Sequence, residues 1–380
     1  MKSKVLIVIA VIMVLPLASA ELTKPNWSTG DYWEFEGQYD GSASMGFENQ
    51  TMESSIDIDI TLRVSVNDVQ VRQVDGDYVG VYATDMSGTL SGTFSYRFGG
   101  EEFSGELTFD LDGTNLFSTT DLSIMESDVN VNISISGLPP GTLPSQLNSL
   151  TTYDPALDFM EFPVSAGETW TAQTTVTTES SMGGMPTTQP VEFTFRCVRT
   201  LGDLYVIETD YVPFIGDIIP INNTNIRWSD SKGMIEEIRG QSQEQNFNLG
   251  LVEYSYTGQE NQPPTAAIST DAQQPSTGDI ISFDGAGSSD PDGTIELYQW
   301  NFGDGVNATG DSVQHAFGEK DTYTVTLTVV DNYGNTATAT RQITVTGSSS
   351  GSSPGFGGIS LVVGLVGAML LLWKRKRDFR

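Results

Sequence analysis

The 380-residue sequence has one cysteine and one histidine, and this scarcity argues against several kinds of chemistry. Cys197 has no second cysteine with which to form a disulfide inside the chain. His315 alone cannot build a histidine-based metal cluster or a histidine pair. Neither a Walker loop nor a dinucleotide-binding fingerprint is present. We therefore expect a protein that is not an enzyme, although its abundant carboxylates leave a carboxylate-pair hydrolase open.

Both single residues are predicted to be structural. Cys197 ends the segment 191–197, in which alternation places the thiol on the same face as two phenylalanines. We expect it to be buried and inert. His315 lies beside Phe317 in a strand-like segment, and we expect its ring to pack rather than to bind a ligand.

Positive charge is also scarce. The whole sequence has 18 basic and 49 acidic residues, a net charge of −31. Without the terminal segments 1–20 and 355–380, 11 basic and 48 acidic residues remain, a net charge of −37. Such a surface repels nucleic acid and anionic lipid head groups, so we expect neither as a partner. The excess of carboxylates is typical of a protein in high salt or among divalent cations, and composition does not separate the two.

No segment has the periodicity of an amphipathic helix, whereas the two-residue period of strands recurs throughout. Apolar and polar residues alternate over 56–66, and again over 107–111 and 129–135. Turn-forming pairs such as Asp112-Gly113 are expected to separate the strands. Short connections favour antiparallel pairing, so we predict an all-β protein.

The first twenty residues have the pattern of a cleavable secretory signal. Two lysines precede thirteen apolar residues, and Ala18-Ser19-Ala20 supplies the small side chains that a signal peptidase needs before Glu21. Thirteen apolar residues are short for a membrane span, which disfavours an uncleaved anchor. We predict a signal peptide over 1–20.

The other end of the chain has the pattern of a membrane span. Residues 355–373 carry no charge, and four basic residues, 374–377, follow at once. As a helix these nineteen residues would extend about 28 Å, close to the thickness of a hydrocarbon core. A basic cluster of this kind stays cytoplasmic, so everything before the predicted transmembrane helix would lie outside the cell.

Pro354-Gly355-Phe356 opens this region, and a basic tail ends the chain. The order of these parts over 354–380 resembles the PGF-CTERM sorting signals of archaeal surface proteins. The resemblance implies that an archaeosortase removes the span and that a membrane lipid is attached to the new C-terminus. The partners would then be that processing enzyme and a lipid anchor. An ordinary single-pass anchor is the alternative.

A change in composition near 259–264 marks a domain boundary. Four landmarks follow in order: Ser289-Asp290-Pro291-Asp292-Gly293, Trp300-Asn301-Phe302-Gly303-Asp304-Gly305, His315-Ala316-Phe317, and Tyr323-Thr324-Val325-Thr326-Leu327-Thr328-Val329. They make residues 263–346 resemble a PKD domain, an immunoglobulin-like β-sandwich. We expect Trp300 and Phe302 to share one core with the apolar face of the last landmark.

Three aspartates of these landmarks, Asp290, Asp292 and Asp304, are candidate calcium ligands, because closely spaced carboxylates provide hard oxygen atoms. The resemblance supports this to the extent that some PKD domains bind calcium. Asx turns explain the same residues without a metal. The sequence leaves both readings open and indicates no other cofactor.

Residues 21–260 are predicted to form a β-rich head, and a Gly/Ser tether over 347–353 follows the PKD-like module. Aromatic and turn-forming runs in the head resemble, loosely, secreted lipoprotein-carrier-like proteins, whose antiparallel sheet curls into a half-barrel. These runs are 27–35, 162–170, 202–208 and 228–235. The resemblance implies a curled sheet or half-barrel and assigns no functional residue.

Five Asn-x-Ser/Thr sequons are candidate glycosylation sites: Asn26, Asn49, Asn132, Asn222 and Asn307. Asn132 alternates with the apolar residues of its strand, so it is expected to face solvent.

We therefore expect a non-enzymatic cell-surface protein at the outer face of an archaeal membrane, with a role in envelope structure or in adhesion through protein or glycan contacts. The alternative is a membrane-tethered binding protein whose curled N-terminal sheet holds a hydrophobic ligand or glycan. A large apolar cavity in the head would favour the alternative, and a filled core would favour the structural role.

Overall fold

A computed structural model of the chain describes residues 22–47, 50–74, 76–98, 101–137, 145–180, 186–209, 224–241 and 245–347. Its regular elements are all strands, which confirms the predicted all-β class. In this part of the chain no helix is long and apolar enough to cross a membrane. The predicted signal peptide, sorting signal and transmembrane helix lie outside the described residues.

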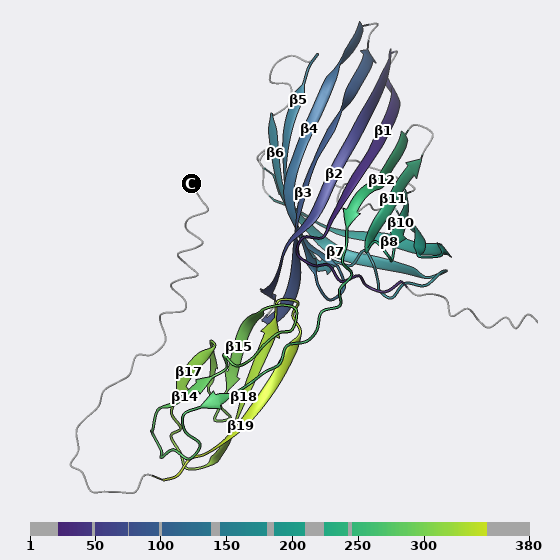
Figure 1. Cartoon of the computed structure of the whole chain (residues 1–380). Helices are drawn as coiled ribbons and strands as arrows, with labels where there is room; N and C mark the ends of the chain where they lie inside the picture. Colours follow the sequence, from purple (N-terminus) through teal and green to yellow (C-terminus); the bar gives the residue numbers. More distant parts are fainter. Residues whose placement is uncertain are drawn as a thin grey trace, which may run out of the picture.

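Twelve strands of the described part form the head (Figure 1). In chain order they are β1 (Tyr32–Phe47), β2 (Gln50–Val74), β3 (Asp77–Phe98), β4 (Glu101–Ser118), β5 (Ile124–Ile135), β6 (Gln146–Leu157), β7 (Thr169–Ser180), β8 (Thr187–Leu201), β9 (Leu204–Thr209), β10 (Thr224–Ser229), β11 (Met234–Gln241) and β12 (Gln245–Ser255). Each pairs antiparallel with its neighbours in the chain, and β1 also pairs with β12. The predicted curled sheet is confirmed. Pairing of β1 with β12 closes it into a barrel, whereas a half-barrel would leave its first and last strands unpaired.

One turn predicted from the sequence is instead part of a strand. Asp112-Gly113 was expected to form a turn, but both residues lie inside β4 and pair with β3 and β5. Gly113 is needed for close packing instead: a Cβ atom there would lie 2.3 Å from the carbonyl oxygen of Asp128 on β5. A glycine inside a strand often marks such a close approach of another backbone.

Large aromatic side chains fill the base of the barrel. Trp27, Trp33, Phe117, Phe159 and Trp228 are each at most 2% exposed. The ring of Trp27 lies 5.3 Å from that of Trp33 and 5.4 Å from that of Phe117, centroid to centroid. Offset and edge-on aromatic pairs at such distances are worth about 1 kcal/mol beyond their burial. This part of the head is a filled core rather than a cavity.

The remaining strands form a sandwich of two sheets, ordered β13-β14-β17 and β16-β15-β18-β19. Their bounds are β13 (Ser269–Thr270), β14 (Ile281–Asp284), β15 (Ile295–Asn301), β16 (Asn307–Thr309), β17 (Ser312–His315), β18 (Thr322–Asp331) and β19 (Thr336–Thr344). Trp300, Phe302, Val325 and Leu327 are at most 1% exposed, and Tyr323 packs against them. The shared core that the landmarks predicted is confirmed.

The turn between β18 and β19 joins the sandwich to the head. The ring of Tyr333 packs edge-on against Tyr82 of β3, with 6.0 Å between centroids. Its hydroxyl donates a hydrogen bond to the carbonyl of Trp27 at 3.1 Å, and the Thr119 hydroxyl donates to the carbonyl of Tyr333 at 2.6 Å. Tyr333 therefore extends the aromatic core of the head across the domain boundary.

Two further residues make this joint close and fixed. A Cβ atom on Gly80 of β3 would lie 2.1 Å from the carbonyl oxygen of Tyr333, so only glycine fits there. Asp331 is buried and accepts hydrogen bonds from the backbone nitrogens of Tyr333 and Asn335, at 2.9 and 2.8 Å. Asn261 of the linker donates to the same carboxylate at 2.7 Å.

Candidate functional site

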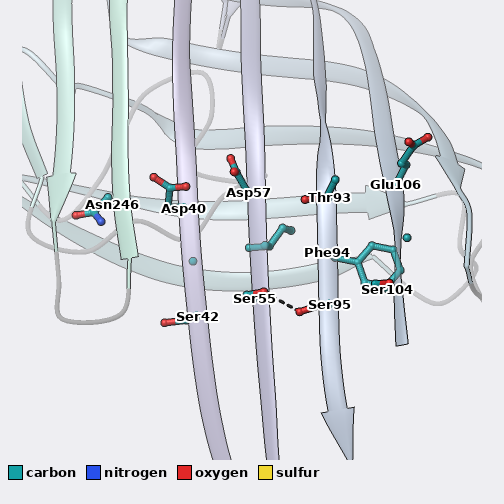
Figure 2. A pocket seen from close by; sticks show the side chains of 13 residues that line it. Asp40, Ser42, Ser55, Asp57, Thr93, Phe94, Ser95, Ser104, Glu106 and Asn246 are labelled. Atoms are coloured by element: carbon teal, nitrogen blue, oxygen red, sulfur yellow. Dashed lines mark hydrogen bonds between the residues drawn. The ribbon is translucent and has the colours of Figure 1, made fainter. Parts of the chain in front are cut away.

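A groove of about 650 Å³ crosses the outer face of strands β1 to β4 (Figure 2). Strand register builds its walls from two parallel rows of polar side chains. One row runs through Asn246, Asp40, Asp57, Thr93 and Glu106 on β12, β1, β2, β3 and β4. The other row consists of four serines: Ser42, Ser55, Ser95 and Ser104. Ser55 and Ser95 are hydrogen-bonded at 2.8 Å.

The dimensions of the groove follow from sheet geometry. Residues two apart on a strand are separated by about 7 Å, which is the distance between the rows, and the five strands of the longer row span about 19 Å. The residues between the rows point the other way, where Ile56 and Phe94 pack against the barrel core. Gly41 and Gly105 complete this intervening row. The groove is thus long and shallow, and it exposes both polar and apolar atoms.

Three carboxylates lie in one row of this groove. Asp40 and Asp57 are exposed and stand directly opposite each other on neighbouring strands. Like charges in that position destabilise a sheet. None of the ion pairs among the described residues includes Asp40, Asp57 or Glu106.

Two other rows on β1 to β4 contain an arginine, whereas the rows through Asp59 and through Glu36 and Asp110 contain none. Beyond the serines, Arg97 stands between Glu53 and Glu102 and lies 3.6 and 2.9 Å from their carboxylates. On the other side of the groove, three rows from Asp40 and Asp57, Arg63 pairs with Glu34. Thr93 lies on β3 between Asp57 and Glu106, just as Arg97 lies on β3 between Glu53 and Glu102.

The groove residues were missed at the sequence level. Their alternation with apolar residues indicated only that they face solvent. Which acidic residues become neighbours depends on strand register, and a shift by one residue would move each set to the opposite face.

The base of the barrel holds the strongest perturbations of acid and base groups. Burial raises the pKa of Asp158 to about 6, and the nearby negative charge of Asp121 adds to this. One Asp158 oxygen is buried and has no hydrogen-bond partner. Burial lowers the pKa of Lys24 to about 8, while Asp121 opposes the shift. The Lys24 ammonium donates to Asn26 Oδ1 at 2.9 Å, so it is held within its own segment.

The structure does not bring the three candidate calcium ligands together. Asp290 and Asp292 precede β15 and Asp304 follows it, so the seven-residue strand separates them by about 20 Å. Asp290 accepts hydrogen bonds from the backbone nitrogens of Asp292 and Gly293, both at 3.1 Å, as an Asx turn does. No group of three or more His, Cys, Asp or Glu side chains in the described ranges is arranged to hold a metal ion.

His315 and Cys197 have the structural roles expected of them. The His315 ring stacks on Phe302 at 4.0 Å, and its Nε2 lies 2.7 Å from a carboxylate oxygen of Asp304. Cys197 is fully buried, and burial raises the pKa of its thiol. A buried thiol of raised pKa is a poor nucleophile.

Three sequons fall on described residues. Asn132 is exposed, as its strand pattern predicted, and Asn307 is exposed at the start of β16. Asn26 is partly buried and accepts the Lys24 hydrogen bond. Asn49, Asn222 and the predicted processing residues Ala18, Ala20, Glu21, Pro354, Gly355 and Phe356 lie outside the described residues.

These features define an all-β protein with a large barrel and a small immunoglobulin-like sandwich. Residues 261–345, which form the sandwich, match the sequence model of the PKD domain, so this module is a PKD domain. PKD domains are typically extracellular, which agrees with an extracellular position of the described chain.

Relatives resemble this chain through the PKD region. The microbial collagenase of Vibrio alginolyticus is 36% identical over 85 residues, which cover 22% of this chain and 10% of that protein. Collagenase ColA of Clostridium perfringens is 38% identical over 85 residues, covering 22% of this chain and 8% of that protein. The PKD1 domain of Vibrio anguillarum Epp is 33% identical and covers 23% of this chain and 99% of that domain, with a TM-score of 0.21. The chain thus spans a tenth or less of both collagenases.

Proposed function

We propose that this protein is a non-enzymatic surface protein of an archaeal cell, which presents its barrel for envelope assembly or adhesion through protein or glycan contacts. The joint around Tyr333 carries the proposal. It fixes the PKD domain end-on to the barrel, so that the two modules form one extended body. The PKD domain would act as a stiff spacer. A barrel with a filled aromatic base and a polar outer surface suits adhesion better than turnover of a substrate.

Anchoring belongs to the same proposal. The signal peptide directs the chain outward, an archaeosortase reads Pro354-Gly355-Phe356, and a lipid takes the place of the span. The filled aromatic base of the barrel supports the structural role over the alternative of a hydrophobic ligand held inside the sheet.

Protease treatment of intact cells tests this proposal. Peptides from the barrel and the PKD domain should be released while a cytoplasmic marker stays intact. Cells stripped in this way should also attach less well to a surface or to one another. Release of these peptides only after lysis would refute surface display, and unchanged attachment and envelope integrity would refute the role.

A further inference from the structure

We infer that β19, at the edge of the PKD sandwich, pairs antiparallel with β19 of a second copy of this chain. The inference deepens the proposed adhesion through protein contacts, on which it rests, by naming the partner and the surface. It starts from the edges of the two sheets in the sandwich, where β19 closes the order β16-β15-β18-β19 (Figure 1).

The edge at β19 differs from the other three edges of the sandwich. The edge strands β13, β16 and β17 have two, three and four residues, whereas β19 has nine. Short length, bulges, lysine and proline are the usual protection of a sheet edge against pairing with another chain. β19 has neither lysine nor proline, and its nine pairs with β18 show no register shift. It is therefore a long edge that lacks these protections.

The backbone of β19 is available for pairing. The backbone nitrogen of Thr344 donates to the carbonyl of Gln273 at 3.1 Å, so Thr344 directs its backbone away from β18. Because this direction alternates along an antiparallel strand, every second residue of β19 does the same. These residues are Thr336, Thr338, Thr340 and Gln342. Within the described ranges their outward backbone groups have no backbone partner beyond β19.

A two-fold axis through Ala339 pairs all four of these residues. Thr338 then lies opposite the partner subunit's Thr340, and Thr336 lies opposite the partner subunit's Gln342. Each such pair exchanges two backbone hydrogen bonds, so the four pairs form about eight, and the two four-stranded sheets become one. Opposed threonines in neighbouring strands are a favourable pair. Arg341, the charged residue of β19, would face the small side chain of the partner subunit's Ala337.

Charge favours this edge for contact between copies. Each copy has a net charge of −31, so two copies repel each other unless the surface between them excludes carboxylates. β19 contains no acidic residue. The residues of β18 on the same face are also uncharged: Thr322, Thr324, Thr326 and Thr328. A basic strand of another protein, which the net charge would attract, finds no carboxylate along β19.

The expected dimer is weak and salt-dependent. A single pair of edge strands buries less area than most stable interfaces, so we expect a dissociation constant in the micromolar range. Screening by molar salt should lower this constant, because it removes the repulsion between the two acidic chains.

Disulfide trapping on the full-length protein in detergent tests the register. In Ala339→Cys the two new thiols would face each other across the axis, within reach of a disulfide. We expect mild oxidation to convert most of this variant to a covalent dimer on a non-reducing gel. Thr336→Cys is the control, since its two thiols would lie about 20 Å apart and stay unlinked. The wild-type chain, with its buried Cys197, should also stay unlinked. No dimer from Ala339→Cys, or equal dimer from both variants, would overturn the inference.

Sedimentation equilibrium of backbone variants tests the pairing without a cross-link. Thr338→Pro removes an N–H that points away from β18, so it blocks the edge and keeps the hydrogen bonds to β18. Thr338→Ala keeps this N–H and is the matched control. We expect wild type and Thr338→Ala to dimerise reversibly and Thr338→Pro to remain monomeric.

Two results would overturn the pairing of copies. One is a wild-type protein that stays monomeric at high concentration in molar salt. The other is a chain that does not dimerise but binds a synthetic peptide of residues 336–344, which would assign the edge to a strand of another protein. Either result leaves the release of peptides from intact cells unchanged, so it is distinct from failure of the proposed function.

Discussion

Asp158 shows how a single half-buried charge sets part of the pH dependence of the barrel. Its chain neighbours Leu157 and Phe159 are buried, and one oxygen of its carboxyl is buried without a hydrogen-bond partner. The pKa of about 6 in the folded state is above the ordinary value, so the folded protein holds this proton more tightly than the unfolded chain. Ionisation of Asp158 therefore costs stability.

The sign of the effect follows directly. Below about pH 4 the group is protonated in both states and has no effect. Between about pH 4 and 6 the unfolded chain ionises first, so stability falls as pH rises. We expect Asp158→Asn to raise the free energy of unfolding at pH 7 by about 1 to 2 kcal/mol, less than the full electrostatic value because the site is partly exposed.

Urea denaturation at pH 4 and pH 7 measures this difference. The gain should vanish at pH 4. Asp128→Asn, at an exposed position of β5, provides the control and should change stability little at either pH. A gain of the same size at both pH values would mean that packing, and not charge, is responsible.

At the scale of elements, the β18–β19 turn decides how the two modules are joined. Gly80 leaves no room for a side chain, because a Cβ atom would also lie 2.4 Å from Thr119 Oγ1. We expect Gly80→Val to separate the modules while each keeps its own core. Proteolysis of the linker over 256–264 should then become faster, and small-angle scattering should show a broader distribution of shapes.

Two further variants calibrate that experiment. Tyr333→Phe removes only the hydrogen bond to Trp27 and should weaken the joint by about 1 kcal/mol. Gly318→Ala places a methyl group where nothing lies within 4 Å and should have no effect. If Gly80→Val leaves linker cleavage and scattering unchanged, the joint is not a stable contact in solution.

At the scale of the whole molecule, charge repulsion should control stability. A net charge of −31 opposes the compact state, and salt screens that repulsion over about 10 Å at 0.1 M. We expect the melting temperature to rise steeply from dilute buffer to molar sodium chloride. Calcium at millimolar level should add no more than its ionic strength, since Asp290, Asp292 and Asp304 are far apart. Melting curves in salt, calcium and chelator distinguish these cases, and a flat response to salt would contradict the explanation.

Processing at the C-terminus also concerns the whole molecule. Intact-mass measurement of the membrane-extracted protein should show a chain that begins at Glu21, lacks 359–380 and carries a lipid. Replacing Pro354-Gly355-Phe356 by alanines should leave the full-length chain in the membrane, because a plain anchor needs only apolar length and a basic stop. A wild-type protein that keeps the tail 374–380 would support a single-pass anchor instead.

Local pattern was enough to predict much of this protein. The two-residue period over 56–66 identified β2, and the landmarks around Trp300 identified the PKD core, because burial of one face of a strand leaves a direct trace in the sequence. Asp112-Gly113 was misread as a turn, since a glycine that permits close strand packing has the same local signature as one that permits a turn.

Closure of the barrel, the groove and the Tyr333 joint depended on tertiary structure. Asp40, Asp57 and Glu106 are separated by tens of residues, and only the register of four paired strands places them in one row. Tyr333 and Trp27 are 306 residues apart, and their contact requires that both modules have already folded. Alternation determines which face of a strand is buried, whereas the pairing of strands determines which exposed residues become neighbours.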